Sequence, residues 1–445
     1  MTTSSSAITS LSGNFGRLWR RGHETFAPEA RRILSVSGKG ATAYLQGLVT
    51  CDLLSAPYPP REEKESPDDS KNGNASGDDE QSKTPMVEFS DKLRSACFLD
   101  NKGRIMTDSL LWKVDDHQYY VDVPGDQADQ LLGHLKQFIL RRSKVKVVDK
   151  SDGMASHVVF GTMNAHGVPP GYIAGMDPRH PSVGMRVLSL EGRDPGRFQK
   201  MMSAQFPHSP GTYDVVRKLS GIAEGGELSG KIALECNQEF LNAVSFRKGC
   251  YLGQELTARV QHTGAIRKRI MPIMFLETSV AVPRPWILAT QIQDGREDEI
   301  FAGEALDSVP PRLPRLSAAA AGTMVADMTG SVDEESMENG AEAVSEAKAH
   351  GQALLDQLQS LKRGDKIVDE KDGKTIGQIV ALPEEGTNVA LAQMRLDRVG
   401  LLGEGKWSYM NKVTIGENKN KLRFLPYLPL WWPEIDRESG KAKDE

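Results

Sequence analysis

Cysteine is scarce in this sequence, and the positions of the four cysteines exclude several classes of protein. The chain has 445 residues, and its cysteines are Cys51, Cys97, Cys236 and Cys250. No C-x-x-C pair is present, which argues against a zinc ribbon and a dithiol redox site. The cysteine content is also too low for a disulfide scaffold. The nine histidines form no H-x-x-x-H pattern, so no mononuclear zinc site is expected.

Long apolar runs and nucleotide-binding glycine motifs are also missing. No run approaches the ~18 to 20 apolar residues that a membrane span needs. The glycine-rich turns match neither G-x-G-x-x-G nor a P-loop, which argues against nucleotide cofactors. The sequence also lacks the stripe of basic and aromatic residues that would indicate nucleic-acid binding. We therefore expect neither a nucleic-acid nor a membrane partner.

The negative charge of the chain is concentrated in two segments. The formal net charge is −5, but residues 61–83 and 331–347 together contribute −10, so the other 405 residues sum to +5. Segments this acidic and this poor in apolar residues cannot bury enough surface to fold alone. We expect a disordered acidic insertion at 61–85 and a second insertion at 295–360. The rest of the chain is close to neutral and slightly basic.

The first 23 residues have the composition of a mitochondrial transit peptide. They are rich in Ser and Thr, contain no acidic residue and place Arg17, Arg20 and Arg21 beside apolar residues at helical spacing. A basic amphipathic helix of this kind is typical of import signals. The alternative is an ordinary disordered N-terminus. The first interpretation predicts a protein of the mitochondrial matrix.

The order of predicted elements indicates an α+β fold. Residues 31–54 are predicted to form a strand, a glycine turn and a helix, and residues 95–114 two strands around a turn at 101–103. An apolar stripe predicts a helix over 126–142, with Asp126 as its N-cap. A second α+β unit is expected from 157 to 190, followed by a helix at 213–219. Strands and turns dominate after 272, with a hairpin around Asp372 and Gly373 and a helix at 353–361.

The densest chemical signal is the stretch 245–259, SFRKGCYLGQELTAR. Cys250 follows Lys248 and precedes a helix-forming run, and both positive charge and a helix N-terminus favour a thiolate. Such a thiol could be a metal ligand, a redox thiol or a nucleophile. The alternative is a cysteine with a purely structural role. Glu255 and Arg259 lie four residues apart and can pair along one helix face.

This stretch resembles the signature of the YgfZ-like branch of the glycine-cleavage aminomethyltransferase superfamily, in particular its mitochondrial iron–sulfur cluster assembly factors. The signature residues are Lys248, Gly249, Cys250, Tyr251, Gly253, Gln254, Glu255 and Arg259. Seven further motifs occur in the order of the family, at 44–52, 98–108, 140–145, 177–186, 221–225, 234–237 and 264–269. Eight ordered motifs are far more specific than any one of them.

The resemblance implies a ring-like aminomethyltransferase fold of ferredoxin-like α+β units with a C-terminal β-barrel. It assigns residues 24–278 to the folate-binding-like region and residues 279–430 to the barrel domain, and leaves residues 431–445 as a polar tail. It also implies a central cavity of folate size. Arg104, Asp108 and Arg186 are the predicted residues of this anion- or folate-binding cavity, although ordinary ion pairs would equally explain the arginines, and a strand-end cap would explain Asp108.

The function implied by the resemblance is maturation of mitochondrial 4Fe–4S proteins. The implied partners are A-type scaffold proteins and client apoproteins of the aconitase and lipoate-synthase kinds. Cys250 would be a transient cluster ligand, and because stable 4Fe–4S clusters take four cysteines, a partner would supply the others. A scaffold role in which Cys250 takes no part is a further alternative.

Two departures from the transferases argue against an enzyme. This chain has Thr107 and Asp108 where the transferases carry paired Asp residues, and Leu219 where they carry a Glu expected to hydrogen-bond the pterin. A missing acceptor for a buried polar group costs about 1 to 3 kcal/mol. Tetrahydrofolate is therefore an open cofactor assignment, and a folate-dependent one-carbon or aminomethyl transferase is the alternative function.

Overall fold

We describe the chain from a computed structural model. The described residues are 22–55, 90, 92–160, 170–180, 183–192, 195–203, 206, 208, 210–276, 354, 356–384, 387–405, 407, 411–417, 420–429 and 431–443. The predicted transit peptide, except residues 22 and 23, the acidic insertion at 61–85 and most of the insertion at 295–360 lie outside them. Within the described part, residues 354 and 356–359 are helical, as expected.

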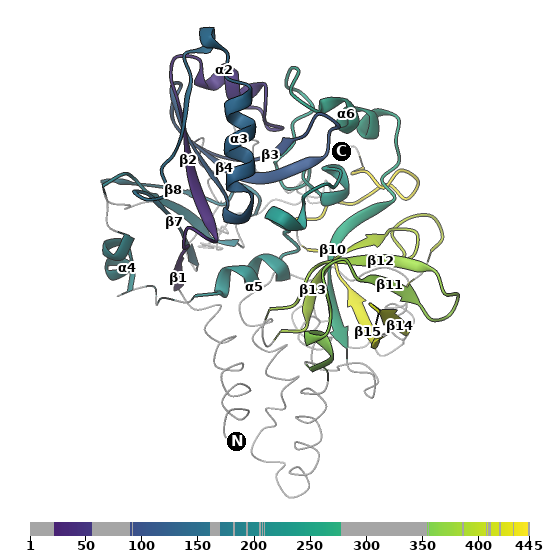
Figure 1. Ribbon diagram of the computed structural model, residues 1–445. Coiled ribbons are helices and arrows are strands. Elements are labelled where there is room, and N and C mark those ends of the chain that lie inside the picture. Colours follow the sequence, from purple (N-terminus) through teal and green to yellow (C-terminus); the bar gives the residue numbers. More distant parts are fainter. Residues whose placement is uncertain are drawn as a thin grey trace, which may run out of the picture.

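A five-stranded antiparallel sheet forms the first layer of the fold (Figure 1). Its strands run in the order β3 (Leu93–Leu99), β4 (Ile105–Asp115), β5 (Gln118–Pro124), β2 (Arg31–Ser37) and β6 (Lys146–Asp149). The strands β3 and β4 and the turn between them are where the sequence predicted them. Alternation sends Leu34 and Val36 of β2 to one face of the sheet and Ile33 to the other.

The helix α3 (Ala128–Gln137) covers one face of this sheet, beside the short helix α2 (Ala41–Gln46). Leu131 and Leu135 pack on the buried side of α3 against the sheet. The predicted range 126–142 was too long at both ends. Asp126 is not the N-cap, because it lies within a 3-10 turn, η1 (Gly125–Gln127), and the chain leaves the helix after Gln137 to reach a second 3-10 turn, η2 (Arg141–Ser143), and then β6.

The other face packs on a second antiparallel sheet. This four-stranded sheet has the order β1 (Gly22–Thr25), β7 (Ala155–Phe160), β9 (Met185–Ser189) and β8 (Tyr172–Met176). Ile33, Leu110 and Trp112 of the first sheet meet Leu188 of the second in a shared core. Phe198 of α4 (Pro195–Ser203) packs on the outer face with Val159 and Val187. The result is a helix–sheet–sheet–helix stack, in which α2 and α3 cover the outer face of the first sheet and α4 covers the outer face of the second.

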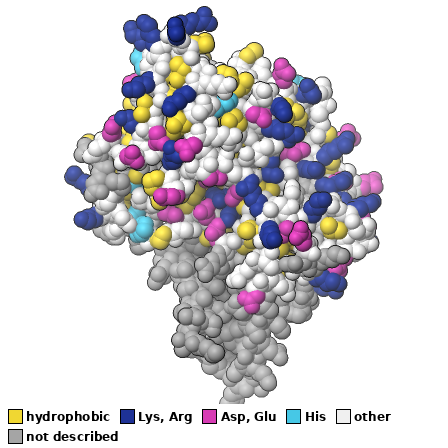
Figure 2. Space-filling model, in the orientation of Figure 1, with side chains coloured by type: hydrophobic (Ala, Val, Ile, Leu, Met, Phe, Trp, Pro, Cys, Tyr) yellow, Lys and Arg dark blue, Asp and Glu magenta, His cyan; other side chains and the backbone are white. Residues whose placement is uncertain are grey.

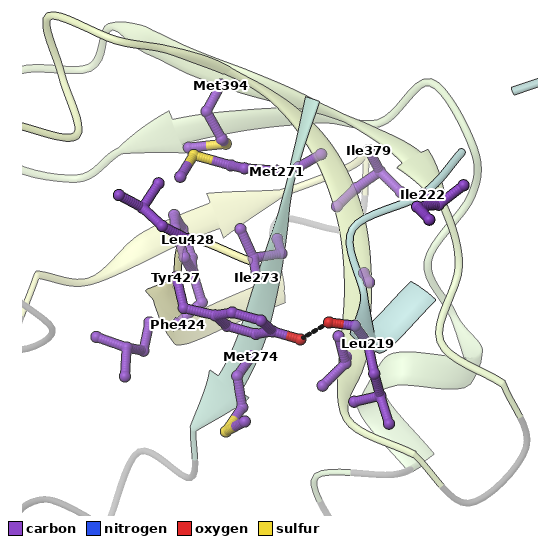
Figure 3. Close-up of a cluster of buried hydrophobic side chains, with 14 of the residues drawn as sticks. Leu219, Ile222, Met271, Ile273, Met274, Ile379, Met394, Phe424, Tyr427 and Leu428 are labelled. Carbon is purple, nitrogen blue, oxygen red and sulfur yellow. Dashed lines mark hydrogen bonds between the residues drawn. The ribbon is translucent and has the colours of Figure 1, made fainter. Parts of the chain in front are cut away.

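A closed six-stranded barrel forms the C-terminal part of the fold, as predicted. Its strands run in the order β10 (Lys268–Leu276), β13 (Val389–Arg395), β12 (Thr375–Ala381), β11 (Lys366–Asp369), β14 (Val413–Ile415) and β15 (Asn420–Pro426). The hairpin around Asp372 and Gly373 joins β11 to β12, and Gly373 has a φ of 68°. The helix α5 (Thr212–Leu219) ends at the barrel core, where the Tyr427 hydroxyl donates to the Leu219 carbonyl at 2.9 Å (Figure 3).

The C-terminal residues are attached to the body rather than loose. Trp431 and Trp432 are buried, and the Trp431 indole donates to the Ser220 carbonyl at 2.7 Å. Arg269, which is fully buried in β10, donates to the Gly440 carbonyl at 3.0 Å. The predicted polar tail therefore contains an apolar anchor that fastens it to the fold.

In the part of the chain that the structure describes, every helix is too short or too polar to cross a membrane.

Candidate functional site

The cysteine loop, residues 245–254, is fastened along the segment that follows α2. The Ser245 amide donates to the Thr50 carbonyl at 3.0 Å, and the Leu252 amide donates to the Gly47 carbonyl at 2.9 Å. The loop then runs into α6 (Gln254–His262), whose N-cap is Gly253. Two of the predicted motifs, 44–52 and 248–259, therefore form one local structure.

Lys248 is the main anchor of the cysteine loop. Its ammonium donates to the carbonyls of Gln46 at 2.7 Å, Val49 at 2.6 Å and Cys51 at 2.8 Å. It also lies 4.8 Å from the centre of the Tyr251 ring, within range of a cation–π contact. Burial lowers the pKa of Lys248 to about 8. Three acceptors match the three hydrogens of an ammonium, so Lys248 joins two chain segments that lie about 200 residues apart.

This geometry changes the role that the sequence assigned to Lys248. The expected role was to favour the Cys250 thiolate by proximity, whereas the ionisable groups that act on the pKa of Lys248 are Cys51 and Asp52. Cys250 also precedes α6 by four residues instead of opening it. Lys248 is therefore a positioning residue for the loop that carries Cys250.

Close contact between two glycines fixes the end of the loop. Gly253 has a φ of +79°, and a Cβ there would lie 2.6 Å from the Asp100 carbonyl oxygen. A Cβ on Gly103, whose φ is +78°, would lie 2.6 Å from the Gly253 carbonyl oxygen. Asp100 in turn accepts from the amides of Lys102 and Arg104 at 2.9 and 2.8 Å. The motif at 98–108 thus packs against the start of α6 and positions it. The Gln254 side chain accepts from the Tyr251 amide at 3.1 Å, which stabilises the turn that leads into the helix.

Cys250 differs from the other three cysteines in being exposed. Burial raises the pKa of Cys51 to about 11 and raises those of Cys97 and Cys236 as well. The Cys97 thiol donates to the Gln238 side chain at 3.2 Å. Since the thiolate is the form that binds metals and reacts, Cys250 is the thiol available for chemistry among these four.

We expect one thiol to react in the native protein. Iodoacetamide added at neutral pH should label Cys250 and leave Cys51, Cys97 and Cys236 unmodified, since the reagent needs an exposed thiolate. Peptide mass spectrometry checks this. The Cys250→Ser variant should then take no label until it is denatured, and rapid labelling of a second native cysteine would contradict the assignment.

The described residues do not form a complete metal site. Nowhere in the described ranges do three His, Cys, Asp or Glu side chains come together in a way that could hold a metal ion. A 4Fe–4S cluster takes four cysteines as a rule, and the exposed thiol is single. If a cluster is a cargo of this protein, Cys250 can supply one ligand and another molecule must supply the rest.

Glu255 and Arg259 lie exposed on α6. Within the described chain, these two residues form no ion pair with each other, in contrast to what their spacing indicated. The Arg259 carbonyl instead accepts from the amides of Thr263 and Gly264 at 2.9 and 3.1 Å, which ends the helix. Gly249 is exposed as well, and a Cβ there would meet nothing within 4 Å.

A second group of functional interest is buried where the sheets meet α5. We call it the buried ion network. Its members all carry charges or hydroxyl groups shielded from water, and they are Arg31, Asp108, Asp122, Asp177, Arg179, Arg186, Tyr213 and Glu224.

Ion pairs link the members of the network. Arg31 pairs with Asp122 at 2.5 Å and with Glu224 at 3.1 Å. Asp177 accepts from Arg179 at 2.7 Å and from Arg186 at 3.1 Å. The Arg179 guanidinium and the Tyr213 hydroxyl both bond to Glu224. The Arg186 guanidinium also lies over the Tyr213 ring at 4.2 Å.

Asp108 is the carboxyl group with the weakest ionic support. Three arginines face four carboxyl groups in the network, and Asp108 lies 4.0 Å from its nearest guanidinium, Arg179. Burial, and then the neighbouring charge of Glu224, raise the pKa of Asp108 from 3.8 to about 6. The arginines hold the pKa of Glu224 well below its ordinary value. A carboxyl group kept partly neutral beside an ionised one is a frequent mark of a functional site.

Neutralising Asp108 is expected to stabilise the protein above pH 6. A pKa that is higher in the folded state contributes stability below the unfolded value, and this stability is lost as the pH rises through about 6. Asp108→Asn keeps an acceptor for the Gly225 amide, which lies 2.7 Å from Asp108. We expect the variant to gain on the order of 1 to 3 kcal/mol at pH 7.5 and little at pH 4.

Urea unfolding of both proteins at several pH values measures this gain. A gain that is the same at pH 4 and pH 7.5, or a loss at pH 7.5, would contradict the assigned titration.

The structure brings together two of the three predicted cavity residues. Asp108 and Arg186 both belong to the buried ion network, and Asp108 lies within β4, which rules out a strand-end cap. Arg104 lies apart on the surface, where its guanidinium donates to the Gly230 carbonyl at 2.8 Å. Arg104 was therefore wrongly grouped with the other two.

The residues of the network do not fit tetrahydrofolate in this arrangement. The side chain of Leu219, at the position where the transferases carry the pterin acceptor, packs in the barrel core (Figure 3). Glu224 is already engaged by Arg31, Arg179 and Tyr213. Arg186 retains one nitrogen, Nη1, without a hydrogen-bond partner, but its residue is fully buried.

The sequence missed several members of the network. Arg31, Asp122 and Tyr213 were not singled out, because single charged or hydroxyl groups in short strands and helices carry no motif. Asp122 is the one with a usable signal: it is a charged residue in the apolar strand YYVDV, and a charge in a strand buried on both faces needs a partner.

The two sites are connected through β3 and β4. Asp108 of β4 is the register partner of Cys97 of β3. The Cys97 amide donates to the Thr50 hydroxyl at 2.8 Å, which donates to the Ala243 carbonyl at 2.5 Å. Ala243 lies two residues before the cysteine loop. A short, buried chain of contacts therefore connects the network to the residues just before the cysteine loop.

This architecture is the fold of the glycine-cleavage aminomethyltransferases, as the sequence predicted. The solved structure of glycine cleavage system aminomethyltransferase T from Bartonella henselae matches with a TM-score of 0.55. The match covers 98% of this chain and 91% of that chain, at 9% sequence identity. No protein-family model matches the sequence.

Comparison of the sequence with curated proteins finds more specific relatives than the fold alone does. The chain is 31% identical over 283 residues to the iron-sulfur cluster assembly factor IBA57 homolog, mitochondrial, of Neosartorya fischeri, covering 56% of this chain and 57% of that protein. The homologs of Pyricularia oryzae and Chaetomium globosum are 31% and 33% identical, and the matches cover 58% and 55% of this chain and 59% and 54% of theirs. The chain thus spans a little over half the length of the curated relatives it matches. The predicted resemblance is confirmed, and the names of the relatives agree with the predicted mitochondrial localisation.

Proposed function

We propose that the protein acts in mitochondrial iron–sulfur cluster assembly and that it helps A-type scaffold proteins to complete 4Fe–4S clusters for client apoproteins. The names of its relatives support the general role. The observation that carries the finer proposal is the cysteine loop: a single exposed thiol, Cys250, stands on a loop that Lys248 and two glycines hold in place.

The surroundings of Cys250 suit a protein partner. Phe246 of the same loop and Leu54, three residues after a carbonyl that Lys248 binds, are 43% and 72% exposed. Exposed apolar side chains are frequent in protein interfaces, and these two stand on the segments that form and anchor the cysteine loop. Gly249 leaves open space beside the thiol. In this proposal Cys250 supplies one cluster ligand, and the scaffold supplies the others.

The buried ion network plays a supporting part in this proposal. It holds the sheets, α5 and the segment before the cysteine loop in one arrangement, and the path through Cys97 and Thr50 transmits that arrangement to the loop. The alternative, an aminomethyl transferase, is less well supported, because this chain has Thr107 in place of one of the paired Asp residues of the transferases and Leu219 in place of their pterin-binding Glu.

Depletion of the protein from cells tests the proposal. Aconitase activity and protein lipoylation should fall, because both depend on 4Fe–4S enzymes, while a 2Fe–2S ferredoxin should keep its cluster. Re-expression of the native chain is the control and should restore both activities. Equal loss of the two cluster types would overturn the proposed place in the process.

A further inference from the structure

We propose that the protein docks on anionic phospholipid surfaces through a basic tip formed by three separate segments. These are the turn at 38–42, the β4–β5 turn at 113–117 and the segment at 140–146, which includes the motif that no part of the proposed function uses. Figure 2 shows Lys and Arg side chains gathered at the end of the molecule where α2 lies in Figure 1.

The cations of the tip are exposed and unpaired. Five of them, Lys39, Arg141, Arg142, Lys144 and Lys146, are exposed, and none forms an ion pair with another residue in the described part of the chain. The adjacent β4–β5 turn adds Lys113, which pairs with Asp116 at 2.8 Å, and one further acid, Asp115. Six cations therefore face two carboxylates, and the tip carries an excess of positive charge.

Backbone packing holds the three segments together. A Cβ at Gly38 would lie 1.9 Å from the Lys144 carbonyl oxygen, so these two turns touch directly. The Gly38 amide donates to the His117 carbonyl at 2.8 Å, and the Thr42 hydroxyl donates to the Asp116 carbonyl at 2.7 Å. The cations thus project from a preformed surface, and their backbone needs no ordering on binding.

Two apolar side chains stand among these cations. Leu140 is 55% exposed and Val114 is 43% exposed, and they are two of the five large hydrophobic side chains that the described chain exposes. Cations around exposed aliphatic groups match an anionic bilayer, where Lys and Arg meet the phosphates and the aliphatic groups enter the interface. Protein interfaces use aromatic anchors as a rule. The two exposed hydrophobic side chains of the tip, Val114 and Leu140, are both aliphatic, which favours a lipid surface over a protein partner. This contact is peripheral and revises the expectation of no membrane partner.

Vesicle sedimentation with the full chain tests this proposal. The native protein should bind vesicles of phosphatidylcholine mixed with phosphatidylglycerol, bind pure phosphatidylcholine poorly and dissociate at high salt. Each Lys or Arg near such a surface contributes about fivefold, so the triple change Arg141→Gln, Arg142→Gln and Lys144→Gln should weaken binding on the order of 100-fold.

Matched variants separate the tip from total charge. Lys366→Gln, Lys371→Gln and Lys374→Gln remove the same charge from exposed positions on the barrel and should leave binding unchanged within about twofold. Leu140→Ser, which keeps every cation, should weaken binding several-fold. Circular dichroism confirms that each variant is folded.

Three results would overturn the proposal. The first is equal binding by the tip and barrel variants. The second is equal binding to anionic and neutral vesicles. The third is binding of the tip to soluble polyglutamate with none to vesicles, which would assign the tip to an acidic protein instead.

Discussion

Replacing Glu224 by Gln is expected to cost about 3 to 5 kcal/mol of unfolding free energy, the largest stability loss among the changes considered. Glu224 pairs with Arg31 at 3.1 Å, bonds to Arg179 and lies 3.6 Å from Arg186. Gln preserves the shape but removes the charge. Three buried guanidinium groups would then keep only Asp122 and Asp177 as close partners, and charge buried without a partner is costly.

A surface pair provides the control for this change. Glu191 pairs with Lys150 at 2.9 Å, and its side chain is 61% exposed. Glu191→Gln should cost no more than about 1 kcal/mol, because water screens exposed pairs. Urea unfolding at neutral pH compares the two variants, and equal costs would show that the network is not held together by charge balance.

The network also predicts a change of sign. Alone, Asp108→Asn is expected to stabilise the protein at pH 7.5, because Glu224 and burial disfavour the Asp108 carboxylate. In the Glu224→Gln background Asp108 becomes the carboxylate that the arginines need, and the same change should destabilise. Buried neighbours in one network couple in this way. Additive effects of the two changes on the free energy of unfolding would contradict the claim that Asp108 and Glu224 are coupled through the same arginines.

The second large effect is expected from Lys248→Met. The methionine stem is nearly as long but cannot donate to the carbonyls of Gln46, Val49 and Cys51. Each buried carbonyl left without a donor carries a penalty, and we expect a loss of about 2 to 4 kcal/mol concentrated in this region. Because the loop would no longer hold Cys250 in place, client maturation should fall although the thiol is still present.

Hydrogen exchange separates positioning from general unfolding. The amides of Ser245 and Leu252, which bond across to the segment after α2, should lose protection, while the barrel strands should not. Lys102→Met removes a neighbouring exposed lysine and should change neither exchange nor maturation. If Lys248→Met leaves maturation intact while the loop exchanges freely, the position of Cys250 is unimportant.

Local patterns in the sequence predicted much of the fold. The β11–β12 hairpin, the helix α5 and the turn after β3 depend on neighbouring residues, so turn chemistry and periodicity were sufficient. The ends of α3 were wrong because the apolar residues Phe138 and Ile139 continue the stripe, while the chain must leave the helix to place β6 beside β2. Such a constraint is tertiary and leaves no local mark.

The candidate site was predictable to the same extent. The glycine-rich motif around Cys250 could be recognised in the sequence. The structure gives the reason for its glycines: Gly103 and Gly253 are in direct backbone contact, which leaves no room for a side chain. The role of Lys248 was not, since its acceptors are main-chain carbonyls about 200 residues earlier. The pairing of Arg31 with both Asp122 and Glu224 could not be recognised before the two sheets and α5 were assembled.

Anaerobic cluster assembly with an A-type scaffold tests the central claim most directly. The native chain and the scaffold should form a complex with the visible absorption of a shared cluster, and Cys250→Ser should form the complex without the cluster. Cys250→Ser keeps the loop and its anchors and changes one exposed atom, so its fold should be intact. The same cluster absorption from the Cys250→Ser complex would contradict the account, because it would show that the exposed thiol is not a ligand.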